Sequence, residues 1–341
     1  MNLLTTIAAI RGRPYPKPPT GDVLDCVEVA DGSRLCCTPL VSVIMITYNH
    51  AQYIRAAIEG VMAQRAPFDY ELLIGEDCST DGTRLIAKQV QKEFPDRIRL
   101  FYSDHNVGWN CNIERLRRRA RGKYIAWCEG DDYWTDSKKL VKQVMLIERT
   151  DTVVSFAFNN MLLVDGTLSP QTCICPEIIR YDECKMYFHL STYLIRAEVL
   201  SKAHNDYPNI PEWYDTVMMP ILATYDKISV LPEVVSVYRV TNMGIATSLN
   251  GRQKLISGLG QSVALYLYGP KECSRNALLS ILRECALYFY SKSSAGSLRT
   301  REGCLVMSLF LRCFPLVFLR CRAWKSAVYL LLSQIGIRRA A

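Results

Sequence analysis

From residue 39 onward, short apolar runs alternate with segments whose apolar residues recur at helical spacing. In the segment 51–65, apolar side chains stand at positions 54, 57, 58, 61 and 62, on one helical face. The predicted strands cover 41–47, 70–75, 97–102 and 124–128, and the helices that follow them cover 51–65, 81–94, 109–120 and 136–149. This alternation with short loops predicts an α/β fold with an open, mostly parallel sheet and helices on both faces.

The flanks of this pattern are less regular. Residues 11–21 hold four prolines, so we expect an arm over 1–38 rather than a core element. After residue 150 we expect strands at 153–158, 190–196, 228–231 and 234–240, a helix at 212–225, and helical structure beyond 251. The expected organisation is therefore an arm (1–38), a main domain (39–250) and a basic, apolar helical region (251–341).

Fourteen cysteines are scattered along the chain, and no secretory signal precedes them. This usage favours reduced thiols in a cytoplasm over a disulfide framework. Cys173, Cys175 and Cys184 lie close together, but no second pair at zinc-finger spacing follows, so ordinary thiols are the favoured interpretation.

The positive charge is concentrated near the carboxyl end. The whole chain carries +8, whereas residues 251–341 hold 14 Lys/Arg against 3 Asp/Glu, a local net charge of +11. Within it, 305–325 mixes large apolar residues with Arg and Lys. An amphipathic helix lying on an anionic membrane surface is one interpretation of 303–341, and a helical cap packed on the main domain is the other. We expect no nucleic-acid partner, because the basic surplus sits in an apolar tail without a recognised binding motif.

An apolar run ends abruptly in carboxylates. Residues 124–128 are apolar, and Glu129, Asp131 and Asp132 follow, with Gly130 between them. Three carboxylates on four residues repel one another, so the fold needs a compensating positive charge. A hard divalent cation, which prefers oxygen ligands, is the usual solution. The cluster therefore points to a metal-assisted enzyme that acts on a nucleotide.

Polar clusters follow two more of the predicted strands. Thr47, Tyr48 and Asn49 end the strand 41–47, and Glu76 with Asp77 ends the next one. Open α/β sheets bind their ligands at the carboxyl ends of the strands. We therefore expect these clusters and the acidic loop to meet at one edge of the sheet.

At this point the chain resembles family 2 glycosyltransferases, which have the GT-A (Rossmann-like) fold. The residues that carry the resemblance are the segments 39–49, 76–83 and 128–134, followed by 237–240 and Gly244-Ile245, in the family's order and spacing. The similarity covers about residues 39–248. It implies a nucleotide-sugar donor, usually a UDP-sugar, together with Mn²⁺ or Mg²⁺. Neither a Walker loop nor a Gly-x-Gly-x-x-Gly motif is present, which disfavours a kinase or a dehydrogenase.

The resemblance also implies roles for individual residues. Asp131 is the first choice for the metal, Asp132 is assigned to the metal or to sugar hydroxyls, and Glu129 to the ribose or to an indirect metal contact. The remaining predicted donor-binding residues are Thr47, Tyr48, Asn49, Asp77 and Arg239. In the family the acidic motif is often Asp-any-Asp, and here Glu129 replaces its first member. Asn49 is equally compatible with a cap on the helix 51–65, and His189 is interpreted as structural.

A transfer to an acceptor hydroxyl needs a carboxylate base. In the family such an acid lies twelve residues before a Lys-Ile pair, and Lys227-Ile228 places it at Asp215. Glu212 is the alternative. A single displacement at the anomeric carbon inverts its configuration.

The sequence therefore predicts an inverting, metal-dependent glycosyltransferase of a bacterial cytoplasm. If 303–341 is the amphipathic helix of the first interpretation, the enzyme would lie on the inner face of the membrane. Its acceptor would be a glycan or a lipid-linked glycan of the cell surface. Two rival functions stay open: a non-catalytic nucleotide-sugar binding module, and a nucleotidyltransferase. The second needs a glycine-rich phosphate loop after the first strand, and 47–51 offers none.

Overall fold

The structure is a computed structural model that describes residues 25–172, 174–180, 188–241, 244, 249, 251–291, 306, 309, 310 and 313. The proline-rich start of the expected arm, Cys173, Cys184, Ile245 and most of 303–341 lie outside the described residues. The chain divides into two compact units: one comprises 18–206 with 222–244, and the other comprises 207–221 with the residues from 245 onward and the first seventeen.

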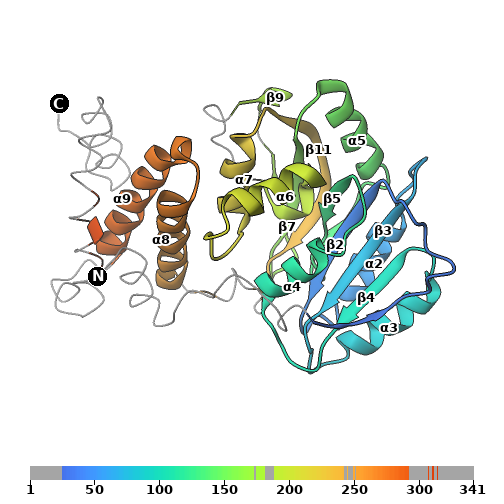
Figure 1. The fold of residues 1–341 in the computed structure, drawn as a ribbon. Helices are drawn as coiled ribbons and strands as arrows, with labels where there is room; N and C mark the ends of the chain where they lie inside the picture. Colours follow the sequence, from blue (N-terminus) through green and yellow to red (C-terminus); the bar gives the residue numbers. More distant parts are fainter. Residues whose placement is uncertain are drawn as a thin grey trace. The chain divides into compact units, whose positions relative to one another are not determined.

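A mixed sheet organises the first unit (Figure 1). Its strands run in the order β1-β4-β3-β2-β5-β10-β7-β11-β6, while β8 pairs with β7 and β9 with β11. Their bounds are β1 Val27–Val29, β2 Val41–Thr47, β3 Tyr70–Glu76, β4 Ile98–Tyr102, β5 Tyr124–Trp127, β6 Tyr133–Trp134, β7 Val154–Leu162, β8 Leu168–Gln171, β9 Ile178–Ile179, β10 Leu194–Arg196 and β11 Ile228–Arg239. The strands β4, β3, β2 and β5 are mutually parallel, as the sequence predicts.

Helices cover both faces of this sheet. They are α2 Ile54–Met62, α3 Thr83–Glu93, α4 Trp109–Arg117, α5 Lys139–Thr150 and α6 Ala197–Asp206. Alternate residues of a strand point to opposite faces. Val43 and Ile74 belong to one buried cluster with Ile54 of α2, whereas a β-carbon on Gly75 would meet Asn112 of α4 on the opposite face. The α/β fold with helices on both faces is thereby confirmed.

Three predicted elements differ from the observed ones. The expected strand 190–196 begins with a 3₁₀ turn, Leu190–Thr192, because polar side chains there bond to the local backbone: Thr192 Oγ1 donates to the His189 carbonyl at 2.7 Å. The two strands expected in 228–240 form one strand, β11, whose register shifts between Leu231 and Val234, around a proline that cannot donate a ladder bond.

The expected arm also contains a strand. Residues Val27–Val29 form β1, which pairs antiparallel with β4 at the edge of the sheet. The prediction of an arm is wrong for these three residues. A strand of three residues is too short to show an alternating apolar pattern, so its pairing with β4 cannot be recognised in the sequence.

The second unit is helical where it is described. It contains most of α7 Asp215–Ala223, then α8 Gly251–Tyr268 and α9 Ser274–Ser291. Leu259 of α8 and Ile281 of α9 share a buried cluster with Val306, Leu309 and Cys313. The prediction of helix beyond 251 is thus confirmed for 251–291. Within the described part of the chain, no helix combines the length and the apolar character that crossing a membrane requires.

Candidate active site at the carboxyl ends of β2, β3 and β5

The three polar clusters meet at one edge of the sheet. Thr47 and Glu76 stand side by side in the parallel register of β2 and β3. The Asp77 N–H donates to the Thr47 carbonyl at 3.0 Å, and the Gly130 N–H donates to the Ile46 carbonyl at 2.9 Å. The carboxyl end of β2 is therefore bonded on one side to Asp77 and on the other to the acidic loop, as the topology predicts.

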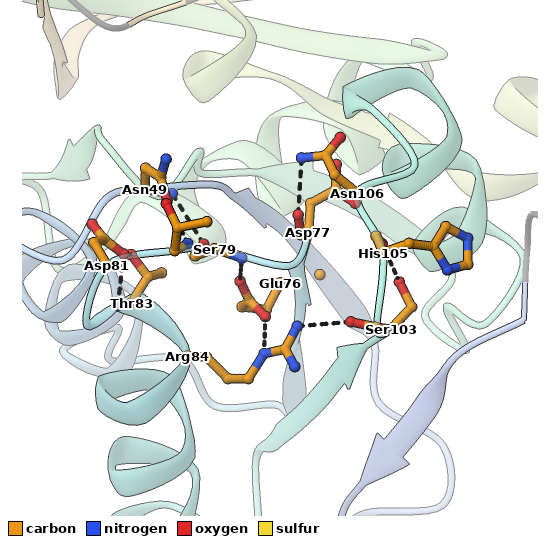
Figure 2. Close-up of polar contacts among 12 residues, drawn as sticks. Asn49, Glu76, Asp77, Ser79, Asp81, Thr83, Arg84, Ser103, His105 and Asn106 are labelled. Atoms are coloured by element: carbon orange, nitrogen blue, oxygen red, sulfur yellow. Dashed lines mark hydrogen bonds and ion pairs between the residues drawn. The ribbon is translucent and has the colours of Figure 1, made fainter.

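The loop after β2 is tied to the loop after β3 (Figure 2). Asn49 adopts the left-handed conformation, with φ at 56°, and its Oδ1 accepts the Thr80 N–H at 2.8 Å. Its own N–H donates to Ser79 Oγ at 3.0 Å. The helix α2 begins only at Ile54, so the alternative that Asn49 caps this helix is wrong. Asn49 instead fixes the loop that carries Tyr48.

Thr47 and Tyr48 present different surfaces at this edge. Thr47 is 2% exposed, and its hydroxyl is buried without a hydrogen-bond partner among the described residues. Tyr48 is 44% exposed. An open aromatic ring beside the end of the strand offers a stacking surface for a base.

Asp77 is buried and holds the next loop of the edge. Its carboxylate accepts the N–H groups of Val107 and Gly108 at 2.8 and 2.9 Å, and its carbonyl accepts the Asn106 side chain at 2.9 Å (Figure 2). Burial raises the pKa of Asp77, and the two N–H bonds oppose that rise. Asp77 therefore connects the end of β3 to the segment 106–108.

The acidic loop turns sharply onto β11. The Asp132 N–H donates to the Glu129 carbonyl at 3.0 Å. Asp132 is 1% exposed, and its Oδ1 accepts the Arg239 N–H at 2.9 Å. Arg239 also donates from Nη1 to the Asp131 carbonyl at 2.8 Å, while its guanidinium lies 4.2 Å from the Tyr133 ring centroid. Burial raises the pKa of Asp132 well above its usual range, and the charges of Asp131 and Glu129 add to this rise.

Asp131 points to a different neighbour. Its Oδ2 lies 3.8 Å from His50 Nε2. Burial lowers the pKa of His50, and the charge of Asp131 opposes that shift. The other ring nitrogen of His50 is buried without a hydrogen-bond partner in the described structure.

The acidic loop has a donor set that fits a divalent cation. Ligand atoms of Glu129, Asp132 and His189 all lie within 4.8 Å of one another. Asp132 Oδ2 is buried and accepts no hydrogen bond from any described residue, and it lies 3.6 Å from His189 Nδ1. Burial lowers the pKa of His189 to about 4, so its ring is neutral near pH 7, as a metal ligand must be. A buried carboxylate oxygen that lacks a hydrogen-bond partner, within a set of two carboxylates and an imidazole, fits Mn²⁺ or Mg²⁺.

The sequence interpretation of His189 as purely structural missed this convergence. The four histidines share no ligand spacing, and His189 reaches the acidic loop through the 3₁₀ turn that precedes β10. No local signal marks such a contact. By contrast, Trp134 is a core residue: it is 4% exposed, and its Nε1 donates to the carbonyls of Trp127 and Ser191.

Comparison with known proteins identifies the family and gives the same fold. The family described as Glycosyl transferase family 2 matches residues 42–190. The uncharacterized protein Rv1520 of Mycobacterium tuberculosis strain H37Rv is 32% identical over 235 residues, which are 67% of this chain and 66% of that protein. This chain belongs to glycosyl transferase family 2.

Other similar proteins have more specific names. A Bacillus subtilis protein named as a teichuronic acid biosynthesis glycosyltransferase, TuaG, is 36% identical over 145 residues, 42% of this chain and 56% of that protein. Among solved structures, S. aureus TarS 1–349 in complex with UDP-GlcNAc superposes with a TM-score of 0.60 at 18% identity, covering 80% of this chain and 81% of that one. The likeness to TarS shows a shared fold.

The two candidate bases of this family 2 chain lie in the segment 207–221, which belongs to the second compact unit. Asp215 is the first residue of α7 and is partly exposed, and its carboxylate accepts the Thr216 N–H at 2.8 Å. Glu212 lies in the connection before α7 and is 8% exposed. Asp215 therefore offers the more accessible carboxylate.

Proposed function

We propose that this protein is an inverting, metal-dependent glycosyltransferase that moves a sugar from a nucleotide-sugar, in our proposal a UDP-sugar, to an acceptor hydroxyl. The single observation that carries the proposal is the shared edge where Thr47, Asp77 and the loop 129–132 are bonded to one another through the end of β2. Family membership supports the same reaction class. A nucleotide, a diphosphate and a cation need such neighbouring aromatic, polar and acidic groups.

The donor would lie along this edge. Tyr48 offers a ring for the base, and Thr47, Asn49 and Asp77 supply polar groups for the base and the ribose. The guanidinium of Arg239 stands beside the acidic loop, where its charge would attract the diphosphate. Stacking on Tyr133 holds that guanidinium in place, which reduces the entropy lost when a phosphate binds.

The carboxylates of Glu129, Asp131 and Asp132 would provide the negative charge that a divalent cation needs. When bound, the cation supplies Lewis-acid stabilisation of the charge that develops on the departing diphosphate. Arg239 adds a fixed positive charge to the same loop and lowers the electrostatic cost of separating the sugar from the diphosphate.

Asp215 would remove the proton of the acceptor hydroxyl. It is the first residue of α7 and is partly exposed, so an acceptor hydroxyl can reach its carboxylate. Direct attack by the acceptor oxygen on the anomeric carbon then inverts the configuration in one displacement. Glu212, which is buried, is the weaker candidate.

The proposed acceptor is a glycan or a lipid-linked glycan of a bacterial surface polysaccharide. The similarity to TuaG supports this class. The enzyme would work in the cytoplasm, on the inner face of the membrane, where the basic region 303–341 would contribute about 1 kcal/mol per Lys or Arg at an anionic surface. Full-length protein should then sediment with anionic vesicles at low salt and be released at high salt. Protein that stays in solution at low salt rules out this location.

A donor screen tests the activity. Purified full-length protein is incubated with UDP-, GDP- and dTDP-sugars in Mn²⁺, and nucleotide release is measured with and without lipid-linked acceptors and with EDTA. We expect release from one class of UDP-sugar that EDTA abolishes. Binding of UDP without release from any donor and acceptor pair supports the binding-module alternative, and pyrophosphate production from a nucleoside triphosphate and a sugar phosphate supports a nucleotidyltransferase. Inversion is checked by NMR of the product's anomeric centre.

A further inference from the structure

We propose that the inner ligands of the cation are Glu129, Asp132 and His189, so that a histidine far from the acidic motif completes the site. This inference rests on the proposed function only in that it concerns the same cation. It departs from the sequence prediction in two respects: Asp131, the first choice for the metal, is not an inner ligand, and His189, interpreted as structural, is one. His189 reaches the site through a 3₁₀ turn rather than through any motif.

The strongest observation is the unequal use of the two Asp132 oxygens. Oδ1 accepts the Arg239 N–H at 2.9 Å, whereas Oδ2 accepts no hydrogen bond among the described residues. Asp132 is only 1% exposed, so water does not compensate that oxygen as it would at the surface. A buried carboxylate oxygen without a partner is costly, and a cation removes the cost.

The distances fit one ion. Two ligands of an octahedral ion with bonds of about 2.1 Å lie about 3.0 Å apart when adjacent and about 4.2 Å apart when opposite. Asp132 Oδ2 and His189 Nδ1 are 3.6 Å apart, within this range. Ligand atoms of Glu129, Asp132 and His189 lie within 4.8 Å of one another, a bound close to the separation of opposite ligands.

The His189 ring is held in place from two sides. It packs on Tyr238 of β11 with ring centroids 4.3 Å apart, and its Nδ1 lies 2.8 Å from Ser191 Oγ. The Ser191 hydroxyl also lies 2.9 Å from Ser236 Oγ, and can turn to it when a cation takes Nδ1. The Ser191 N–H reaches Nδ1 only at 3.3 Å, so little is lost when that contact opens. Stacking on Tyr238 keeps the ring oriented after a cation takes Nδ1, and a fixed ring favours metal binding over a mobile side chain.

Asp131 and His50 provide the matched rival site. They form the other carboxylate–imidazole pair of the loop, with Asp131 Oδ2 and His50 Nε2 3.8 Å apart. Asp131 is not one of the three residues whose ligand atoms converge. Substitutions of Asp132 and His189 should therefore affect Mn²⁺ binding differently from substitutions of Asp131 and His50.

The experiment measures Mn²⁺ bound to the full-length protein, with and without UDP, by electron paramagnetic resonance. Affinity comes from the loss of the free-ion signal, and pulsed spectra report ¹⁴N coupling from a directly bound imidazole. We expect wild type to show that coupling, and His189→Gln to lose it and to bind Mn²⁺ at least about tenfold more weakly. Asp132→Asn should weaken binding similarly. His50→Gln should keep the coupling and change the affinity by less than about threefold, because a neutral imidazole that is not a ligand adds no charge to the site. Asp131→Asn should also keep the coupling, although the loss of its charge weakens Mn²⁺ binding.

Three results overturn the inference: no ¹⁴N coupling in wild type, loss of the coupling in His50→Gln, or its persistence in His189→Gln. The first two do not require the His189 variant to fold. The failure of the proposed function is separate. A protein that releases UDP but binds Mn²⁺ through Asp131 and His50 keeps the function and loses this site, whereas one that binds Mn²⁺ through His189 but releases no nucleotide keeps the site and loses the function.

Discussion

Gly130 and Thr47 approach so closely that only a glycine fits between the acidic loop and β2. A β-carbon on Gly130 would lie 2.6 Å from Thr47 Oγ1 and 2.8 Å from Thr47 Cβ. It would also lie 3.0 Å from His50 Nδ1. The absence of a side chain at Gly130 therefore allows its N–H to reach the Ile46 carbonyl, and that bond holds the carboxylates at the edge of the sheet.

Gly130→Ala should consequently displace the acidic loop. We expect a loss of about 1–3 kcal/mol in the free energy of unfolding, as for other overpacked sites. The rate of nucleotide release should fall by more than this loss of stability explains. Gly82→Ala is the matched control, because its β-carbon would meet only Ala51 Cβ at 3.7 Å. Urea denaturation and the UDP-release assay measure both. Equal stability and equal activity of the two variants would show that the close approach has no consequence.

The ammonium of Lys139 is fully buried, and this should make stability depend on pH. Its Nζ donates to Gln143 Oε1 at 2.7 Å and lies 4.3 Å from the Trp134 ring centroid. Burial lowers the pKa of Lys139 to about 7 from its usual 10.5. Between these values the unfolded chain binds the extra proton, so the cost of burying Lys139 is full below pH 7 and disappears as the pH rises toward 10.5.

Lys139→Met removes this cost. The gain in unfolding free energy of the variant over wild type should therefore be largest near pH 7 and decline by about 1.4 kcal/mol per pH unit above it. Urea unfolding at pH 7, 8 and 9 measures the decline. Lys138→Met, at the exposed neighbouring position, should show no such trend. A constant difference across this range would mean that Lys139 is charged in the native protein.

Asp215→Asn should lower kcat by about 10²–10⁴ while UDP-sugar binding persists, because the amide cannot take a proton from the acceptor. Glu212→Gln should lower kcat by less than about tenfold if Asp215 is the base. Steady-state kinetics and calorimetric donor binding separate the two effects. Full activity of the Asp215 variant, together with an inactive Glu212 variant, would transfer the role to Glu212.

Asp77→Asn tests whether this carboxylate contacts the nucleotide or only holds the neighbouring loop. The amide turns an NH₂ group toward one of the two backbone donors at Val107 and Gly108, so stability should fall by about 1–3 kcal/mol. If Asp77 also contacts the base or ribose, the Kd for UDP should rise about tenfold or more. Asp104→Asn, an exposed position of the same loop, is the control for both measurements. Reduced stability with an unchanged Kd would limit Asp77 to holding the segment 106–108.

Local pattern was sufficient to predict the centre of the fold. The strands β2 to β5 are buried on both faces, so each is mostly apolar in the sequence, with Glu71 and Arg99 as charged exceptions. In the helices between them, apolar residues recur with the period of 3.6 residues. Polar residues at the ends of these runs also predicted the edge where Thr47, Asp77 and Asp132 gather, because parallel strands end on the same side.

Only the tertiary structure decided which side chains meet across separate elements. The pairing of β1 with β4, the continuous β11 and the approach of His189 to Asp132 depend on contacts between segments distant in the chain, and such contacts leave no period in the sequence. The sequence by itself determined the sheet edge and its acidic loop. Folding decided that Asp131 faces His50 while Asp132 faces His189, because the direction of each side chain is set by the turn and by β11 packed against it.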